Sequence, residues 1–386
     1  MIDKETYSIG HIRNLQHKYT VDPGLIERAL FAFGLLEALR RVDMPFCFKG
    51  GTCLMLILDK PARLSTDIDI MIDPGTDVDG YIEKASKIFP FAGKKEVIRK
   101  GKNGIVKKHF KFTYFSPVMN AEFYILLDVV FAQIPYAKTI QKEIKNDLLL
   151  TSGENLRVKV PTPDCILGDK LTAFAPHTTG ILLGAGKELE IAKQLFDLGT
   201  LFDYLSDYDL FSKTYEKAVA EETGFRGQDW NMEFVLNDTI RACVSIISRG
   251  TIDKAEYVEY LQGIKSLNNH VLQSNYSTDE ATWKACKVMY LASCLLSGND
   301  FKTIKNPGDY ANLRLANDKY KKLAYVRKVN TEAYAYLVEA SRNIEKSEQF
   351  YKRSNIQYLE SVISDINEGR AHFEEHKLIA DPEDDT

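Results

Sequence analysis

The chain has 386 residues, of which 45% are hydrophobic and 27% charged, a composition typical of a folded protein rather than a disordered one. This length suffices for two domains and a sizeable core. The net charge of −4 gives no global signal for nucleic-acid binding, although a local basic patch remains compatible with it.

Cysteine spacing and hydropathy indicate a soluble, cytoplasmic protein. The six cysteines form no CxxC pair and no Cys/His cluster, so we expect reduced residues buried in the core. The N-terminal segment lacks the apolar region of a signal peptide. No apolar run approaches the ~20 residues that a membrane span needs, so we expect no membrane association.

The first elements expected along the chain are a short helix or arm over the polar residues 1–20 and a helix over residues 22–41. Asp22 is the expected N-cap, and Pro23 occupies the first turn. Apolar residues recur with helical period in this segment, whereas Glu27 and Glu37 fall off the apolar face. The pattern therefore predicts that these two carboxylates lie away from the core.

Strands and helices are mixed between residues 46 and 174. Strands are predicted over residues 46–49, 66–72, 96–100, 106–115, 122–131 and 156–160. Helices are predicted over residues 52–58, 79–89 and 166–174. A hairpin turn is expected at Lys102-Asn103-Gly104.

After about residue 187 the pattern becomes helical. Helices are predicted over residues 187–204, 211–223, 232–248, 253–267, 279–296 and 332–345. This change places a domain boundary in the glycine-rich segment 178–187. We therefore predict an α+β fold with a domain over residues 1–186, a helical C-terminal domain over 187–375 and an acidic tail over 376–386.

Three aspartates on apolar strands are candidate metal ligands. Asp67 and Asp69 stand at i and i+2 of a strand, so they share a face. Asp128 lies within the apolar run ILLDVVF, where a buried carboxylate is costly unless it is paired or binds a metal. Such a set suits two Mg²⁺ ions and phosphoryl or nucleotidyl transfer, with Asp128 as a base for the attacking hydroxyl. The alternative is that the DID sequence is merely a turn at a strand edge.

Gly50-Gly51-Thr52 joins a predicted strand to a predicted helix. The glycine N–H groups and the Thr52 hydroxyl could cradle the phosphates of a nucleotide at the helix N-terminus. The alternative is an ordinary strand-to-helix connection with Thr52 as the N-cap. Neither a P-loop nor a dinucleotide-binding glycine pattern occurs in the chain.

Basic residues after this turn are candidate phosphate ligands. Arg63 and Ser65, in the loop 59–65, could reach a phosphate, or they could belong to a solvated basic loop. Lys170 stands on an apolar helix face, which suits a charge directed at a triphosphate or a snorkelling lysine. Lys193 and Asp197 are spaced i and i+4, so they either pair on the helix surface or face a cleft.

These motifs together resemble the AbiEii/AbiGii-type toxin nucleotidyltransferases of the polymerase-β-like superfamily. The resemblance covers about residues 20–205, and its parts are GGT at 50–52, the S-x-D-I-D sequence ending at Asp69, the strand with Asp128, D-K-L-T-A-F from Asp169, and K-x-x-x-D from Lys193. It implies a nucleotidyltransferase fold in which Mg²⁺ and the nucleotide phosphates are bound by Gly50, Gly51, Thr52, Asp67 and Asp69. It also implies a role in activity for Lys170, Lys193 and Asp197.

The chain departs from the family pattern at two places. Gln194 stands where the second motif usually has an aspartate after its lysine. Gly51-Thr52 replaces the Gly-Ser of the wider superfamily, and the insertion before the DxD motif is long. These changes leave the predicted metal site intact.

The resemblance also implies partners. Related members are toxins of toxin–antitoxin or phage-defence (abortive infection) systems, and some transfer nucleotides to the 3′ end of tRNA. An NTP, an RNA acceptor and a cognate antitoxin protein are therefore expected. Candidate phosphate contacts are a group of basic residues on neighbouring predicted strands, whose alternative role is a charged sheet edge that blocks aggregation: Lys94, Lys95, Arg99, Lys100, Lys102, Lys107, Lys108 and Lys111.

Three hypotheses follow. The first is a Mg²⁺-dependent nucleotidyltransferase that acts on RNA. The second is transfer of a nucleotide to a small molecule such as an antibiotic, which suits the acidic net charge. The third is a binding module that holds a nucleotide or an antitoxin without turnover, against which the intact Asp67, Asp69 and Asp128 argue.

Overall fold

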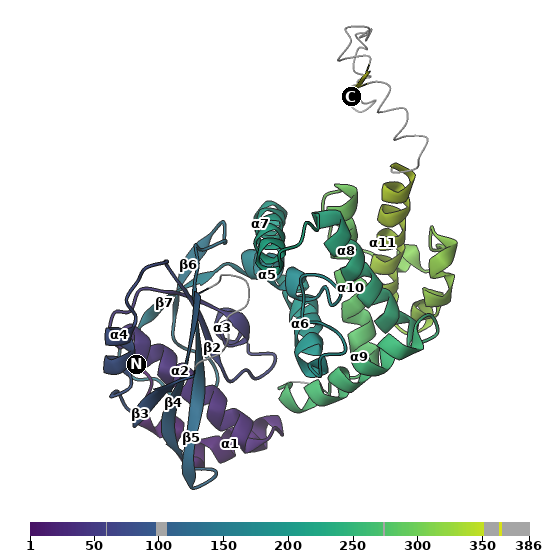
Figure 1. The fold of residues 1–386 in the computed structure, drawn as a ribbon. Helices are drawn as coiled ribbons and strands as arrows, with labels where there is room; N and C mark the ends of the chain where they lie inside the picture. The colour runs from purple at the N-terminus through teal and green to yellow at the C-terminus, as the bar shows by residue number, and fades with distance from the viewer. Residues whose placement is uncertain (59, 98–105, 273–274, 351–362, 365–386) are drawn as a thin grey trace, which may run out of the picture.

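A computed structural model describes residues 1–58, 60–97, 106–272, 275–350 and 363–364. Figure 1 shows a β-sheet with N-terminal helices on one side and a large group of helices on the other. The predicted hairpin turn at residues 102–104 and the acidic tail lie outside the described residues.

The described strands form one mixed sheet of seven strands in the order β3-β4-β5-β2-β1-β7-β6. Strands β2 and β5 are parallel, as are β1 and β7, and the other neighbours are antiparallel. Their bounds are β1 (Cys47–Lys49), β2 (Ile68–Ile72), β3 (Gly93–Glu96), β4 (Val106–Ser116), β5 (Ala121–Phe131), β6 (Thr139–Glu143) and β7 (Arg157–Pro161). The sequence analysis missed β6, a polar edge strand without an alternating apolar pattern. Its predicted strand over residues 96–100 overlaps β3 only at Glu96, and residues 98–100 lie outside the described residues.

The helices that precede or flank the sheet are η1 (Lys4–Tyr7), α1 (Ile9–Tyr19), α2 (Pro23–Arg41), α3 (Gly50–Ile57), α4 (Asp79–Ala85) and α5 (Pro163–Ala173). Helix α2 begins as predicted, because the Asp22 side chain accepts the N–H of Leu25 and Pro23 stands in the first turn. It packs on one face of the sheet, where the Phe31 ring stacks on Tyr114 with centroids 3.8 Å apart.

The prediction that Glu27 and Glu37 lie away from the core is wrong. Glu27 is 1% exposed and accepts hydrogen bonds from the Tyr114 hydroxyl, the Ser116 hydroxyl and the Val118 N–H, each at 2.9 Å. Glu37 accepts the N–H of Ile2 at 2.7 Å. Helix α2 is covered on nearly all sides, and both carboxylates are buried because backbone and hydroxyl donors satisfy them.

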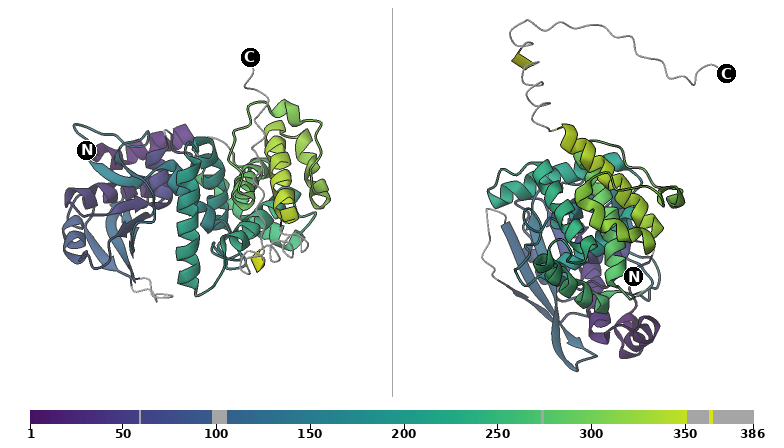
Figure 2. Two further views of the ribbon diagram at one scale, coloured as in Figure 1. Left: turned by 90° about the horizontal axis from the view of Figure 1, so that it is seen from above. Right: turned by 90° about the vertical axis from the view of Figure 1, so that its right-hand side faces the viewer.

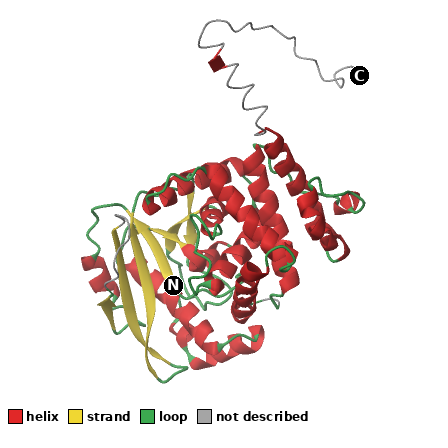
Figure 3. Ribbon diagram, turned by 45° about the vertical axis from the view of Figure 1, so that its right-hand side comes forward, coloured by secondary structure: helices red, strands yellow, loops and turns green. Residues whose placement is uncertain are grey.

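Every described element after Pro161 is helical. These elements are α5, already given, and α6 (Glu188–Leu201), η2 (Phe202–Tyr204), α7 (Tyr208–Arg226), α8 (Met232–Ser248), α9 (Lys254–Leu267), η3 (Asn268–His270), α10 (Thr278–Ser297), η4 (Pro307–Tyr310), η5 (Asp318–Lys328) and α11 (Thr331–Phe350). Figure 1 shows α5, α6 and α7 between the sheet and the remaining helices, and Figure 3 shows the strands gathered on one side of the molecule, beside the large group of helices. The predicted α+β fold class is confirmed, whereas the exact domain boundaries stay a prediction.

The sheet and the helices share one large hydrophobic core, which contains residues of α2, the sheet, α5, α6 and α10. Figure 2 shows the two halves in contact along one side of the sheet. Helices α5 and α7 approach closely, since a Cβ at Gly168 would lie 2.7 Å from the carbonyl oxygen of Phe211. All six cysteines are buried and free, as predicted. Within the described residues, no helix has the length and hydropathy of a membrane span.

Candidate active site

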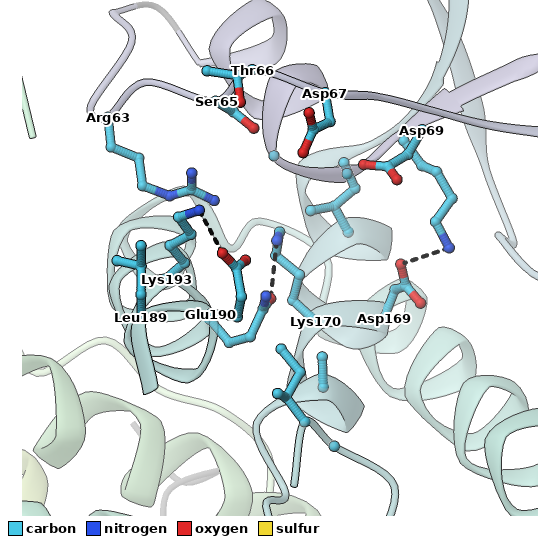
Figure 4. Close-up of a pocket in the computed structure, with 18 of the residues that line it drawn as sticks. Arg63, Ser65, Thr66, Asp67, Asp69, Asp169, Lys170, Leu189, Glu190 and Lys193 are labelled. Carbon is cyan, nitrogen blue, oxygen red and sulfur yellow. Dashed lines mark hydrogen bonds and ion pairs between the residues drawn. The ribbon is translucent and has the colours of Figure 1, made fainter. Parts of the chain in front are cut away.

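A polar pocket of about 700 Å³ lies where β1, α3 and the start of β2 face α5 and α6. Figure 4 shows Asp67 and Asp69 on one wall and Lys170 and Lys193 on the opposite wall. The pocket therefore brings together most of the residues that the sequence analysis selected. Those that line it are Gly50, Gly51, Arg63, Ser65, Asp67, Asp69, Lys170 and Lys193.

Asp67 and Asp69 lie on either side of Ile68, which is fully buried, so both carboxylates face the pocket. Neither carboxylate has a hydrogen bond or an ion pair with the residues that the structure describes. Loss of hydration, together with repulsion from Asp128 and Asp67, raises the pKa of Asp69 to about 6, although the positive charge of nearby Lys49 acts to lower it. Loss of hydration and the charge of Asp128 also raise the pKa of Asp67.

Gly50 and Gly51 allow the start of α3 to approach this wall. Gly50 has φ +82°, and a Cβ there would lie 2.1 Å from a carboxylate oxygen of Asp69. A Cβ at Gly51 would lie 2.7 Å from the Ser65 hydroxyl oxygen and 2.9 Å from the Arg63 guanidinium. The two glycines thus keep open a space at a helix N-terminus, beside two carboxylates, where backbone N–H groups favour an anion.

Thr52 is not part of the pocket. Helix α3 begins at Gly50 rather than at Thr52, and Lys49 is its N-cap residue. Thr52 is fully buried, and its hydroxyl donates to the backbone carbonyl of Asp67 at 2.6 Å. The Thr52 hydroxyl faces inward and holds the start of β2 through this contact. The predicted contact between Thr52 and a phosphate is therefore wrong.

Asp128 stands beside Asp69, because β2 and β5 are parallel and these two residues are in register. Residues paired in this way lie on the same face of the sheet. The Asp128 carboxylate, which is 28% exposed, accepts a hydrogen bond from His109 Nδ1 at 2.6 Å. Asp128 is not a lining residue of the pocket, but its charge acts on both Asp67 and Asp69.

The donor set fits Mg²⁺. Among the described residues, no three His, Cys, Asp or Glu side chains form a ready protein cage for a metal. Mg²⁺ does not need one, because it is usually held by one or two carboxylates together with phosphate oxygens and water. Asp67 and Asp69 are two such carboxylates without a partner among the described residues, and a cation would offset the loss of hydration and the repulsion that raise their pKa values.

The opposite wall carries amino groups. Lys170 of α5 is buried, and its Nζ lies 2.8 Å from Asp197 Oδ2 and 3.2 Å from Gln194 Oε1. Lys193 of α6 lies 2.8 Å from Glu190. Both lysines line the pocket, so a triphosphate on the glycine turn would face two positive charges.

Of the two alternatives for Lys193 and Asp197, the pair on the helix surface is wrong, because Lys193 pairs with Glu190 instead. Asp197 is 3% exposed and holds Arg63 through two hydrogen bonds, Nε to Oδ1 at 2.7 Å and Nη2 to Oδ2 at 2.6 Å. Burial acts to raise the pKa of Asp197, but Arg63 and Lys170 together keep it below its ordinary value. Helical spacing could not reveal this arrangement, because Arg63 comes from a loop 134 residues away.

The family model of the "Nucleotidyl transferase AbiEii toxin, Type IV TA system" matches residues 35–291, which is more than half of the chain. The chain belongs to the AbiEii family. This finding confirms the resemblance inferred from the motifs, and it makes the protein a nucleotidyltransferase of a toxin family.

This AbiEii chain has low similarity to several solved structures. JHP933 from Helicobacter pylori is 14% identical with a TM-score of 0.38, and the match covers 70% of this chain and 92% of that one. A putative nucleotidyltransferase from H. pylori is 15% identical with a TM-score of 0.37, over 71% and 99% of the two chains. An antigenic nucleotidyltransferase-like protein from Paracoccidioides brasiliensis is 14% identical with a TM-score of 0.33, over 51% and 94%. No curated protein matches the chain.

Gln194 replaces an aspartate of the AbiEii pattern without disrupting the pocket wall. Its side-chain oxygen accepts a hydrogen bond from Lys170, so the amide still supports the lysine. Among the described residues, Asp197 supplies the negative charge within ion-pair distance of Lys170. The departure from the family pattern therefore removes one charge and keeps one hydrogen-bond acceptor.

The sequence analysis missed several residues that line the pocket of this AbiEii protein. Lys49 Nζ lies 3.8 Å from Asp169 Oδ2, which also accepts the Tyr136 hydroxyl at 3.0 Å. The sequence offered a way to find this pair, because each residue is adjacent to a selected one: Lys49 directly precedes the glycine turn, and Asp169 directly precedes Lys170. No local pattern marked the remaining charged lining residues, which come from distant helices: Arg28, Glu190, Glu222, Arg226 and His270.

Proposed function

We propose that this AbiEii-family protein is a Mg²⁺-dependent nucleotidyltransferase that moves an NMP from an NTP to a hydroxyl of RNA, at the 3′ end of tRNA. In this proposal it acts in the cytoplasm as the toxin of a toxin–antitoxin or abortive-infection system, where a cognate antitoxin restrains it. Membership of a type IV toxin family supports the toxin and antitoxin parts. The RNA part is based on related toxins that modify tRNA.

One observation carries the catalytic part of the proposal. Asp67 and Asp69 face the pocket, with no partner in the part of the chain that the structure describes, directly beside the glycine turn at the N-terminus of α3. Two carboxylates that repel one another are costly unless they serve a cation. Their position next to an anion-favouring helix start supports a joint site for Mg²⁺ and a triphosphate.

The residues of the chain then have distinct tasks. The N–H groups of Gly50 and Gly51 bind phosphate oxygens, and Lys170 and Lys193 hold the triphosphate from the opposite wall. Asp67 and Asp69 are the residues that would hold Mg²⁺. When bound, Mg²⁺ supplies positive charge that stabilises the phosphate oxygens and the leaving pyrophosphate.

The reaction is an in-line displacement at the α-phosphorus. The oxygen of the acceptor hydroxyl forms a bond to this phosphorus, and the bond from the phosphorus to the bridging oxygen breaks. Pyrophosphate leaves with the electron pair of the broken bond. The hydroxyl proton passes to the Asp128 carboxylate, which His109 orients through its 2.6 Å hydrogen bond.

The test uses the purified chain, each of the four NTPs with an α-phosphate label, Mg²⁺ and total RNA. We expect label on RNA with the wild type and none with Asp69→Asn. Asp73→Asn is the matched control, because Asp73 follows the same strand but does not line the pocket. Label on small molecules alone would favour the antibiotic-type transferase. NTP binding without any transfer would favour the binding module.

A further inference from the structure

Strand alternation sorts the lysines of β3 and β4 between the two faces of the sheet. Lys94 and Lys108 point toward α4, where Lys108 pairs with Asp79 at 2.8 Å and Lys94 lies 3.8 Å from Glu83. These two lysines therefore serve the structure on the face that α4 covers. They are neutralised by acids of the protein itself.

Lys95, Lys107 and Lys111 lie on the other face. Within the described residues, none of them has an acidic partner in ion-pair contact. Lys95 and Lys111 stand directly opposite one another on antiparallel strands. Like charges in this position destabilise a sheet. An anion bound between the two lysines would offset their repulsion.

The same face leads directly to the candidate active site. His109 lies between Lys107 and Lys111 on β4, and it stands opposite Asp128, which in turn stands beside Asp69. Each of the two lysines is two residues from His109, or about 7 Å along the strand. A phosphate held by either lysine is thus about one nucleotide away from a hydroxyl at Asp128.

An aromatic ring is present on this face as well. Tyr124 of β5 stands opposite Thr113, and the Lys111 amino group lies 4.0 Å from the centre of its ring. Rings of this kind stack on unpaired bases, and they do so with little regard to sequence. Glu122 stands opposite Phe115 farther along, so the cationic part of the face is the part nearest the active site.

We propose that this acceptor face, defined by Lys95, Lys107, Lys111 and Tyr124, binds the unpaired end of the RNA acceptor. The inference rests on the proposed function and deepens it. The three lysines contact backbone phosphates around the RNA end, Tyr124 stacks on a base, and the terminal hydroxyl lies at Asp128, between Lys107 and Lys111 along the sheet. Single-stranded RNA is the occupant because the charges match phosphates, the ring requires exposed bases, and the face continues into the pocket that holds the nucleotide.

The test compares the triple variant Lys95→Gln, Lys107→Gln, Lys111→Gln with the wild type. The control is Lys254→Gln, Lys265→Gln, Lys321→Gln, which removes three exposed lysines of the helical half. Binding of a short single-stranded RNA is measured by fluorescence anisotropy over a range of salt concentrations. The KM for RNA and the NTP-induced shift in Tm are measured on the same samples.

We expect the acceptor-face variant to bind RNA at least tenfold more weakly than the control variant, with an unchanged NTP-induced shift in Tm. The slope of log K against log salt should fall by about 2, since each phosphate contact on a single strand contributes about 0.7. A second variant, Tyr124→Leu, should weaken RNA binding about fivefold or more without a change in salt slope.

Two outcomes separate failure of this inference from failure of the proposed function. If the wild type modifies RNA but the acceptor-face variant keeps the affinity and salt slope of the control, the inference is wrong and the proposed function stands. If the wild type neither binds nor modifies RNA, both are wrong. Tighter binding of duplex RNA than of single-stranded RNA would also overturn the inference.

Discussion

At the scale of single residues, the charged carboxylate of Asp69 in the pocket lowers the stability of the folded protein. Asp69 keeps a carboxylate in a place where loss of hydration, with repulsion from Asp128 and Asp67, raises its pKa to about 6. A carboxylate whose pKa is higher in the folded state than in the unfolded state destabilises the fold at neutral pH. This cost disappears as the pH falls through the folded-state pKa toward the unfolded-state value.

Asp69→Asn should therefore stabilise the metal-free protein while it abolishes transfer. After allowance for solvent screening of a partly exposed group, we expect a gain of about 1–2 kcal/mol in the free energy of unfolding at pH 7.5. The gain should shrink between pH 6 and pH 4. Denaturant unfolding in EDTA across this pH range measures it, and a gain that grows toward acid pH would contradict the assignment.

Mg²⁺ should restore the folding stability that the charged Asp67 and Asp69 carboxylates remove from the wild type. A ligand that binds only the folded state raises stability in proportion to the logarithm of its concentration above Kd. Titration with MgCl₂ at constant ionic strength should raise the Tm of the wild type and of Asp73→Asn. The double variant Asp67→Asn, Asp69→Asn should show no such rise, and an equal rise in all three proteins would place the metal elsewhere.

At the scale of elements, Asp197 of α6 ties the loop before β2 to the helical half. Its two oxygens hold Arg63 and Lys170, and all three side chains are buried. The removal of one partner from such a group leaves a buried charge uncompensated. We expect Asp197→Asn to lower the free energy of unfolding by about 3–5 kcal/mol.

Glu190→Gln is the matched control for Asp197→Asn. It removes a carboxylate from the same helix, but its pair with Lys193 is partly exposed and should contribute about 1 kcal/mol at most. Urea unfolding of both variants measures the difference. Equal costs for the two substitutions would show that the buried Asp197 contacts do not hold the two halves together.

Element-scale patterns also explain how much the sequence could predict. Period-two and helical patterns located five of the seven described strands and the main helices, and the i, i+2 spacing of Asp67 and Asp69 gave their shared face. The partners of Glu27 and Asp197 could not be predicted, because they are donors from distant segments that reach across the core. Thr52 was misassigned because a local motif does not reveal which way a hydroxyl turns once α3 begins two residues earlier.

At the scale of the whole molecule, the sheet and the helices act as one body around the pocket. A shared core, the close packing of α5 on α7 and the Arg63–Asp197 contact all cross between the two halves. We therefore expect a single cooperative unfolding transition. Near-UV circular dichroism and far-UV circular dichroism should give coincident thermal curves, and two separated transitions would show that the halves are independent.

The central claim is that the pocket between the Asp67 wall and the Lys170 wall transfers a nucleotide. Its most direct test follows the label from NTP that carries it on either the α- or the γ-phosphate. We predict that the α-label appears on the RNA acceptor, that the γ-label leaves as pyrophosphate, and that Asp67→Asn and Asp69→Asn abolish both events. A γ-label on the acceptor, or undiminished α-label transfer by Asp69→Asn, would contradict the account.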